Sequence, residues 1–228
     1  MERILAWAVH VFTALGAVLG AWALLAIDRG EWRGALLLLF AALLVDSADG
    51  ALARAARVSQ VLPNFDGRRL DDMVDYLNYV VVPAVFLVAA GYLPHWGWAA
   101  VPILASAYGF GHAEAKTDDH FFLGFPSYWN VVAFYAWALD VPPWFCTLAV
   151  VVLAIGVFVP FKYIYPSHLT RLRGTTVAIG AVSSVGSITL LIDPALGRSL
   201  YLDYVSMLFP AWYLLLSFAL GGLQRSPR

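Results

Sequence analysis

The segment GALLLLFAALLVDSADGALARAAR, residues 34–57, decides the fold that the sequence predicts. Its first half is entirely apolar, and Asp46 and Asp49 follow without a break in the helical pattern. A helix needs about 20 mostly apolar residues to cross a hydrocarbon layer of about 30 Å. An aspartate at the centre of such a helix costs about 2.5–3.5 kcal/mol even on lenient insertion scales. The segment therefore predicts a membrane-spanning helix whose acids need a cation or deep water beside them.

The rest of the sequence has the composition of a membrane protein. Of its 228 residues, 61% are hydrophobic and 13% are charged, whereas soluble domains typically have about 45–50% apolar and about 25% charged residues. A formal net charge of -1 gives no sign of a nucleic-acid partner. The single cysteine, Cys146, excludes an intrachain disulfide and a cysteine-type zinc site.

Long apolar runs separated by short loops predict an all-α, polytopic integral membrane protein with about eight transmembrane helices. The runs lie at 5–27, 33–56, 70–91, 96–113, 127–139, 143–161, 174–192 and 201–222. The first run is too long for a typical signal-peptide core, so we expect it to be retained. No second domain is visible, and residues 1–228 are predicted to form one membrane-embedded domain.

The distribution of basic residues predicts the orientation of these spans. With the N-terminus in the cytoplasm, the three basic residues on the outer side are Arg29, Arg33 and Arg198. The eleven on the cytoplasmic side are Arg3, Arg54, Arg57, Arg68, Arg69, Lys116, Lys162, Arg171, Arg173, Arg225 and Arg228. Because Lys and Arg accumulate in cytoplasmic loops, the loop between the second and third spans is predicted to be cytoplasmic.

The third span opens with GRRLDDMVDYLNY, residues 67–79. Asp71 and Asp75 are four residues apart and share a helix face, as Asp46 and Asp49 do at a spacing of three. Antiparallel packing across the short loop would bring all four carboxylates to one membrane depth. Hard divalent cations such as Mg²⁺ or Mn²⁺, which prefer oxygen ligands, would remove the repulsion between them. Two such ions about 3.5–4 Å apart would clamp a phosphoryl group for in-line displacement.

The residues around these acids suit a phosphate-containing ligand. Gly50 and Ala53 are small enough to let a nucleotide or a neighbouring helix approach the backbone. Arg54 has a planar guanidinium that can hold a diphosphate. Gly67, at the start of the next helix, suits a tight turn with its amide directed at a phosphate.

The chain resembles the CDP-alcohol phosphatidyltransferases in the pattern Asp46-x-x-Asp49-Gly50-x-x-Ala53-Arg54 and then Gly67-x-x-x-Asp71-x-x-x-Asp75. Twelve residues separate Arg54 from Gly67, more than in most of that family and similar to the spacing in bacterial phosphatidylcholine synthases. The resemblance extends to KTDDHFFLGFPSYWN at 116–130 and FKYIYPSH at 161–168, so it covers most of the chain.

The resemblance implies a function for each matched position. The residues expected to ligate two Mg²⁺ or Mn²⁺ ions are Asp46, Asp49, Asp71 and Asp75. Asp75 would also be the base that takes the alcohol proton. The residues expected to hold the CDP part of CDP-diacylglycerol are Gly50, Ala53, Arg54 and Gly67. Choline's hydroxyl would attack the phosphorus attached to diacylglycerol and release CMP. The resemblance also implies a site on the cytoplasmic face of the bacterial inner membrane, and a homodimer.

Aromatic faces commonly hold a quaternary ammonium such as that of choline. Tyr76 and Tyr79 are the preferred cage candidates because they lie on the turn after Asp75. Further aromatic residues near the cytoplasmic side are Phe121, Phe122, Phe125, Tyr128, Trp129, Tyr163 and Tyr165. Since Tyr and Trp gather at membrane interfaces in any case, packing is the expected role of any single one of them.

Other polar residues have weaker functional signals. Asp66 is expected to make a turn before Gly67, and Asp72 lies off the face shared by Asp71 and Asp75. Arg171 and Arg173 are expected to be interfacial anchors. A loop that either is solvated or gates the substrate contains Glu114, Lys116, Asp118, Asp119 and His120. The histidines show no metal-ligand spacing, so we expect them to be interfacial or packing residues.

Two alternatives remain open at the level of sequence. The first keeps the reaction and changes the alcohol to serine, inositol or glycerol phosphate; the low number of basic residues beyond Arg54 disfavours phosphorylated alcohols. The second, from a different functional class, is a cation- or proton-coupled transporter that uses the same aspartates.

Overall fold

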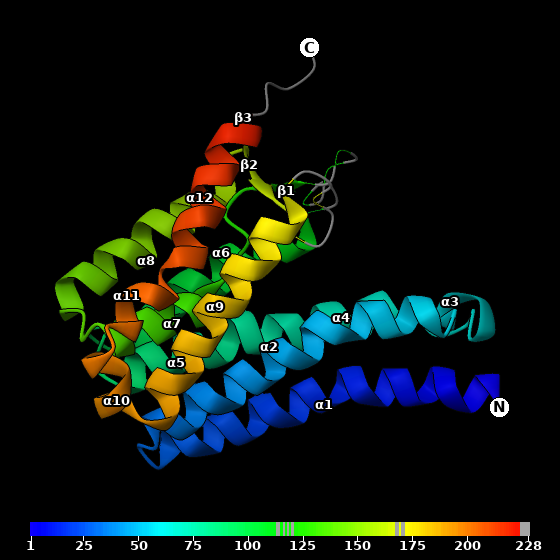
Figure 1. Ribbon diagram of the computed structural model, residues 1–228, viewed down its shortest axis with the longest axis horizontal. Helices are drawn as coiled ribbons and strands as arrows, with labels where there is room; N and C mark the ends of the chain where they lie inside the picture. Colours follow the sequence, from blue (N-terminus) through cyan, green and yellow to red (C-terminus); the bar gives the residue numbers. More distant parts are fainter. Residues whose placement is uncertain are drawn as a thin grey trace. The chain divides into compact units, whose positions relative to one another are not determined.

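The structure is a computed structural model that describes residues 1–112, 115, 117, 119, 121–166, 169 and 172–223. Helices dominate this part of the chain (Figure 1), which confirms the predicted all-α class. The helices in it that are long and apolar enough to cross a membrane are Glu2–Asp28, Trp32–Ala55, Gly67–Ala89, Arg173–Ile192 and Leu202–Leu220. The protein is therefore polytopic, as predicted. The runs predicted at 96–113, 127–139 and 143–161 form shorter helices, so the total of eight spans stays a prediction.

The described chain forms two compact units, and the first comprises Met1–Ala99 and Trp129–Phe134. Its elements are α1 (Glu2–Asp28), α2 (Trp32–Ala55), α3 (Val58–Val61), α4 (Gly67–Asp75), the π-helix η1 (Tyr76–Val81), α5 (Val82–Ala89), the 3-10 helix η2 (Trp96–Ala99) and the start of α7 (Trp129–Ala138). Within this unit, α1 packs along both α2 and α4 (Figure 1). The short helix α3 is held to α1 because Val58 and Leu62 are buried against Ala6 and Val9.

The second unit comprises the rest of the described chain. Its elements are α6 (Ala100–Gly111), β1 (Phe121–Leu123), the end of α7, α8 (Pro143–Phe158), β2 (Phe161–Ile164), α9 (Arg173–Ile192), α10 (Pro194–Ser199), α11 (Leu202–Ser206), α12 (Leu208–Leu220) and β3 (Gly222–Leu223).

A small antiparallel sheet in the second unit was not predicted. Its strand order is β1-β2-β3, with Phe121 opposite Ile164 and Lys162 opposite Gly222. The apolar pattern at 143–161 predicted that the sixth span would continue to Phe161. However, α8 ends at Phe158, and Pro160 cannot donate a backbone hydrogen bond to continue the helix. The chain beyond it is extended and pairs with two other segments.

The third span is not a uniform α-helix. Gly67–Asp75 is α-helical, Tyr76–Val81 forms a π-helix, and Val82–Ala89 is α-helical again. A π-turn contains more residues than an α-turn and occurs often at functional sites. The side chains beyond Asp75 therefore point in directions that α-helical spacing would not predict.

Two glycines of α1 allow the third span to approach closely. A Cβ added to Gly16 would lie 2.6 Å from Cγ1 of Val74, and one added to Gly20 would lie 2.5 Å from Oδ1 of Asn78. The buried side-chain amide of Asn78 donates a hydrogen bond of 2.9 Å to the carbonyl oxygen of Gly16. Small residues four positions apart commonly permit such close helix packing in membranes. The register between α1 and the third span is therefore set by these contacts.

We expect the Gly16→Ala variant to be destabilised by about 1–3 kcal/mol, since its methyl group would overlap Val74 in a packed interface. Thermal unfolding of the purified protein in detergent measures the effect. The matched control is Gly174→Ala in α9, where an added Cβ meets no atom within 4 Å among the described residues. Equal melting temperatures for the two variants would contradict the close packing.

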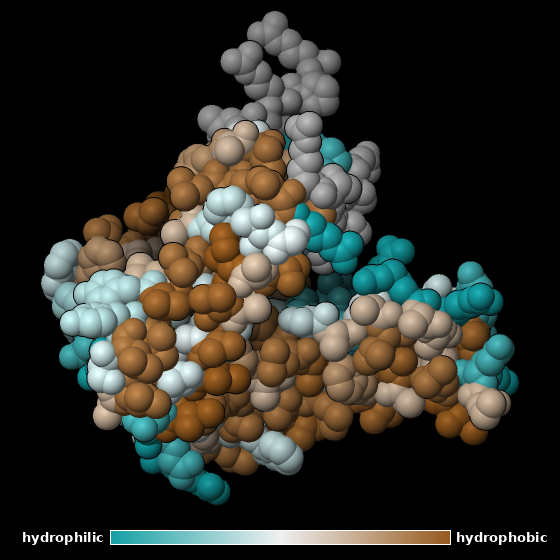
Figure 2. Space-filling view, in the orientation of Figure 1, coloured by the Kyte–Doolittle hydropathy of each residue, from teal (hydrophilic) through white to brown (hydrophobic). Residues whose placement is uncertain are grey.

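Apolar side chains face outward from the spanning helices, as lipid-facing side chains do. Val11 and Trp22 of α1 are 59% and 55% exposed, and Val177 and Phe218 in the second unit are 63% and 68% exposed. Figure 2 shows apolar residues over much of the visible surface of the helices. An outer surface of this kind supports placement in a membrane.

Candidate metal centre

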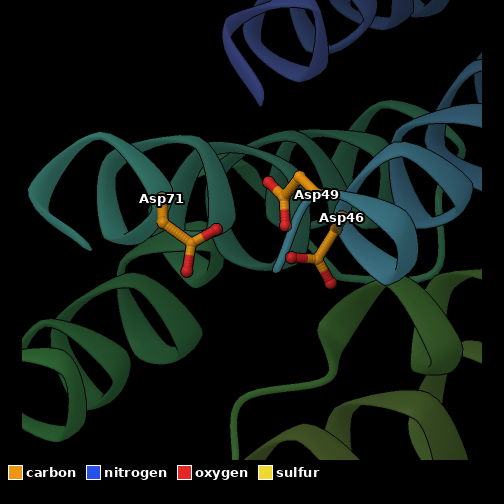
Figure 3. Close-up of side chains that lie close together, drawn as sticks. All are labelled: Asp46, Asp49 and Asp71. Atoms are coloured by element: carbon orange, nitrogen blue, oxygen red, sulfur yellow. The ribbon is translucent and has the colours of Figure 1, made fainter. Parts of the chain in front are cut away.

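Three carboxylates from two helices lie close together in the first unit. Asp46 and Asp49 come from α2 and Asp71 comes from α4, and one oxygen of each lies within 4.8 Å of the other two (Figure 3). Asp49 is buried, with 7% of its surface exposed, and the other two are partly buried. The predicted convergence of the two acidic helix ends is therefore present for these three residues.

The chain between the two helices places α4 by local interactions. Asp66 caps the helix, since its side chain accepts hydrogen bonds from the backbone N–H groups of Arg68 at 3.2 Å and Arg69 at 3.3 Å. The guanidinium of Arg69 also forms an ion pair with Asp66 at 3.1 Å. Caps of this kind satisfy the free N–H groups of a first helical turn. Asp66 is therefore the turn residue that the sequence predicted.

Hydroxyl groups from two other segments bind the aspartates of α2. Oγ1 of Thr13 in α1 donates a hydrogen bond of 2.8 Å to Oδ2 of Asp49. The hydroxyl of Tyr79 in η1 donates a hydrogen bond of 2.7 Å to Oδ2 of Asp46. The two aspartates of α2 are thus each hydrogen-bonded to a residue of another segment, Asp49 to α1 and Asp46 to η1.

The other two acids of α4, Asp72 and Asp75, are not in this group of three carboxylates. Asp75 is the last residue of α4, is partly buried, and is not a member of the group of three acids within the described residues. Asp72 is exposed, as expected for a residue off the shared face. Asp75 as a metal ligand and as a base stays a prediction.

The predicted CDP-binding residues are close to the three aspartates in the sequence. Gly50, Ala53 and Arg54 follow Asp49 in α2, and Gly67 precedes Asp71 in α4. The guanidinium of Arg54 lies back over Gly50, with Nη1 3.3 Å from the position that a Cβ would take. Ala53 packs against the buried residues that join α1 to α3. A Cβ on Gly67 would lie 2.8 Å from Cε1 of His10, so the close approach of α1 explains the need for glycine there. CDP binding by these four residues stays a prediction.

His10 packs against aromatic side chains, which is one of the two roles expected of the histidines. It is 6% exposed, and its ring centroid lies 5.8 Å from that of Trp7 and 4.3 Å from that of Phe65. This aromatic group lies beside the first turn of α4, where it fixes the position of Gly67.

The aromatic candidates for a choline cage are buried to different degrees. Tyr79 is 8% exposed, and Tyr76 is partly buried. Trp129 is fully buried, and the rings of Tyr128 and Tyr163 pack against Tyr213 with centroids 5.9 Å and 6.2 Å away. For Trp129, Tyr128 and Tyr163 this packing agrees with the expected structural role.

Part of the predicted polar loop lies in the described chain. Nζ of Lys162 forms an ion pair of 2.6 Å with Asp119, and hydrogen bonds from Lys162 and Thr117 lower the pKa of the Asp119 carboxyl below its ordinary value. Asp119 therefore joins this loop to β2. The predicted residues that lie outside the described residues are Glu114, Lys116, Asp118, His120, His168, Arg171, Arg225 and Arg228.

Thr13 was not predicted to be part of the site. Its only local signal is spacing: Thr13, Gly16 and Gly20 occur at i, i+3 and i+7, on one face of the first span. That face is the one that packs against the acid-bearing helices. A polar residue on a small-residue face of a membrane helix was the available clue.

The donor set of the cluster fits a hard divalent cation. Three carboxylate oxygens within 4.8 Å repel one another strongly in a partly buried site. Mg²⁺ and Mn²⁺ prefer such oxygen ligands, and a bound ion would offset the repulsion. Asp46, Asp49 and Asp71 are the residues that would hold it.

Comparison with known proteins adds an independent finding. No protein-family model matches the chain. The chain is 41% identical to the phosphatidylcholine synthase of Legionella pneumophila over 93% of its own length and 87% of that protein. It is 39% identical to the phosphatidylcholine synthase of Pseudomonas aeruginosa, over 85% and 82% of the two chains. For the phosphatidylcholine synthase of Bradyrhizobium diazoefficiens, the identity is 40% over 86% and 74%.

Proposed function

Because the chain belongs to the phosphatidylcholine synthase family, we propose that it condenses CDP-diacylglycerol with choline to give phosphatidylcholine and CMP. The structural observation that carries the proposal is the meeting of Asp46, Asp49 and Asp71. Such a group of carboxylates in a membrane protein suits a metal-dependent reaction at a phosphate. The helices that carry the site are apolar and long enough to cross a membrane, which supports a lipid substrate.

The reaction is a single displacement at phosphorus. The oxygen of choline forms a bond to the phosphorus that carries diacylglycerol, the bond from that phosphorus to the oxygen of CMP breaks, and the hydroxyl proton of choline passes to a base. Bound Mg²⁺ or Mn²⁺ would neutralise charge that grows on the phosphoryl oxygens. We assign Asp75 as the base, because it lies one helical turn beyond the metal-ligand candidate Asp71 on the same helix.

The remaining roles follow the family pattern. The residues proposed to hold the CDP part are Gly50, Ala53, Arg54 and Gly67. The guanidinium of Arg54 would bind the diphosphate, while the small residues leave space for the nucleotide. Tyr76 and Tyr79 are proposed to contact the quaternary ammonium of choline. Asp75 would be among the residues that hold a second metal ion.

We further propose the bacterial inner membrane as the location, with the site facing the cytoplasm. The excess of Lys and Arg in the loops on that side supports this orientation. The expected assembly is a homodimer.

The test uses purified full-length protein in detergent with CDP-diacylglycerol, Mn²⁺ and one alcohol at a time. CMP release and phosphatidylcholine formation are expected with choline, and EDTA should stop both until excess Mn²⁺ is added. Metal-dependent CMP release with serine, inositol or glycerol phosphate in place of choline would change the substrate assignment. Absence of turnover together with ion flux in liposomes would instead favour a transporter.

A further inference from the structure

We propose that Tyr79 and Thr13 are positioning residues of the metal centre, each holding one aspartate of α2 from a different segment. This inference rests on the proposed function, since it assigns the cluster of Asp46, Asp49 and Asp71 to a divalent cation. Neither residue belongs to the acidic pattern from which the site was predicted.

The hydroxyl of Tyr79 makes a close hydrogen bond to the carboxyl group of Asp46. The oxygen–oxygen distance is 2.7 Å, and O–H···O⁻ bonds of about 2.5–2.7 Å are stronger than bonds between neutral groups. Tyr79 is 8% exposed, so packing restricts the rotation of its side chain. A fixed donor of this kind limits the orientations open to the Asp46 carboxylate.

Thr13 holds Asp49 in the same way. It lies in α1, which precedes α2 in the chain, whereas Tyr79 lies in η1, which follows α2. The hydrogen bond is 2.8 Å long, and both side chains are 7% exposed. Threonine is branched at Cβ and has few rotamers in a helix, which makes its hydroxyl a stiff support. The two aspartates of α2 are therefore each held by a hydroxyl that belongs to another element.

The π-helix η1 links Tyr79 to the helix that contains Thr13. Tyr79 and Asn78 are neighbours in η1, and Asn78 donates to the carbonyl oxygen of Gly16 in α1 at 2.9 Å. Gly16 is one helical turn from Thr13. The segment that directs Tyr79 toward Asp46 is thus fixed to the helix that directs Thr13 toward Asp49. Groups that orient metal ligands commonly change metal affinity or activity by about 10–100-fold when they are removed.

The experiment measures Mn²⁺ binding to purified full-length protein without substrate, from the free Mn²⁺ signal in electron paramagnetic resonance. We expect the Kd for Mn²⁺ to rise about 10–100-fold in Tyr79→Phe and in Thr13→Val, which lose only the donor. Thr13→Ser keeps a hydroxyl and should bind nearly as the natural protein does. At saturating Mn²⁺ the turnover of both weakened variants should recover. The KM for choline should be unchanged, because Tyr79→Phe keeps the aromatic ring proposed to contact the ammonium group.

The control variants remove hydroxyls away from the cluster. Tyr201 is 69% exposed, and Thr189 donates to the carbonyl oxygen of Val185 in its own helix. Tyr201→Phe and Thr189→Val should keep the natural Kd for Mn²⁺. Melting curves without metal show whether each variant is folded, and if Thr13→Val does not fold, the Kd of Tyr79→Phe for Mn²⁺ decides the question.

Three negative results are distinguishable. If the natural protein binds Mn²⁺ and Tyr79→Phe and Thr13→Val bind it equally well, the positioning role is wrong while the metal centre stands. If the natural protein binds no divalent cation, the metal centre itself is wrong. A raised KM for choline with unchanged Mn²⁺ binding in Tyr79→Phe would also overturn the positioning role, because the hydroxyl would then act on choline and not on Asp46.

Discussion

Replacing Asp49 with Asn should abolish tight Mn²⁺ binding and lower turnover by about 100- to 1,000-fold, as removal of one preorganised group that stabilises developing charge does. Asn has the same shape and can still accept the hydrogen bond from Thr13, which is 2.8 Å long in the natural protein. The change therefore removes the negative charge with little change in packing. Mn²⁺ titration and CMP release on the same preparation measure the two effects.

The matched control for this substitution is Asp72→Asn. Asp72 is exposed and lies outside the group formed by Asp46, Asp49 and Asp71. The same chemical change there should leave Mn²⁺ affinity and turnover close to those of the natural protein. If Asp49→Asn binds Mn²⁺ as tightly as Asp72→Asn does, the carboxylate of Asp49 is not a ligand.

Replacing Asp75 with Asn should lower turnover without abolishing Mn²⁺ binding. We expect the variant to retain at least one bound Mn²⁺, because Asp75 lies outside the group of three carboxylates among the described residues. Turnover at saturating substrates should fall by about 100- to 10,000-fold, the usual contribution of a positioned general base. An amide cannot take the proton of the choline hydroxyl, so loss of the base reduces the chemical step itself.

The comparison between the two variants separates binding from catalysis. Asp49→Asn should lose metal and activity together, whereas Asp75→Asn should lose activity with metal still bound. If Asp75→Asn keeps its turnover, another group must accept the proton. If it loses all Mn²⁺, Asp75 acts first as a ligand, and its role as the base needs separate proof.

Much of the site could be predicted because its information is local in the sequence. The spacing of Asp46 and Asp49, and of Asp71 and Asp75, places each pair on one face of a helix whatever the rest of the chain does. A short connection then forces the two helices to be antiparallel neighbours. For this reason the sequence alone predicted the membrane class and the convergence that the structure confirms for Asp46, Asp49 and Asp71.

The contacts that support the aspartates could not be predicted from the sequence. They depend on how the helices are rotated and packed against one another, which no local pattern encodes. Gly16 and Gly20 set the approach of α1 to the third span, and the π-turn changes the direction of Tyr79. The sequence by itself determined which acids share a helix face, because helical periodicity fixes that. Only the tertiary structure decided that Thr13 and Tyr79 hold two of those acids, because such contacts arise between segments far apart in the chain.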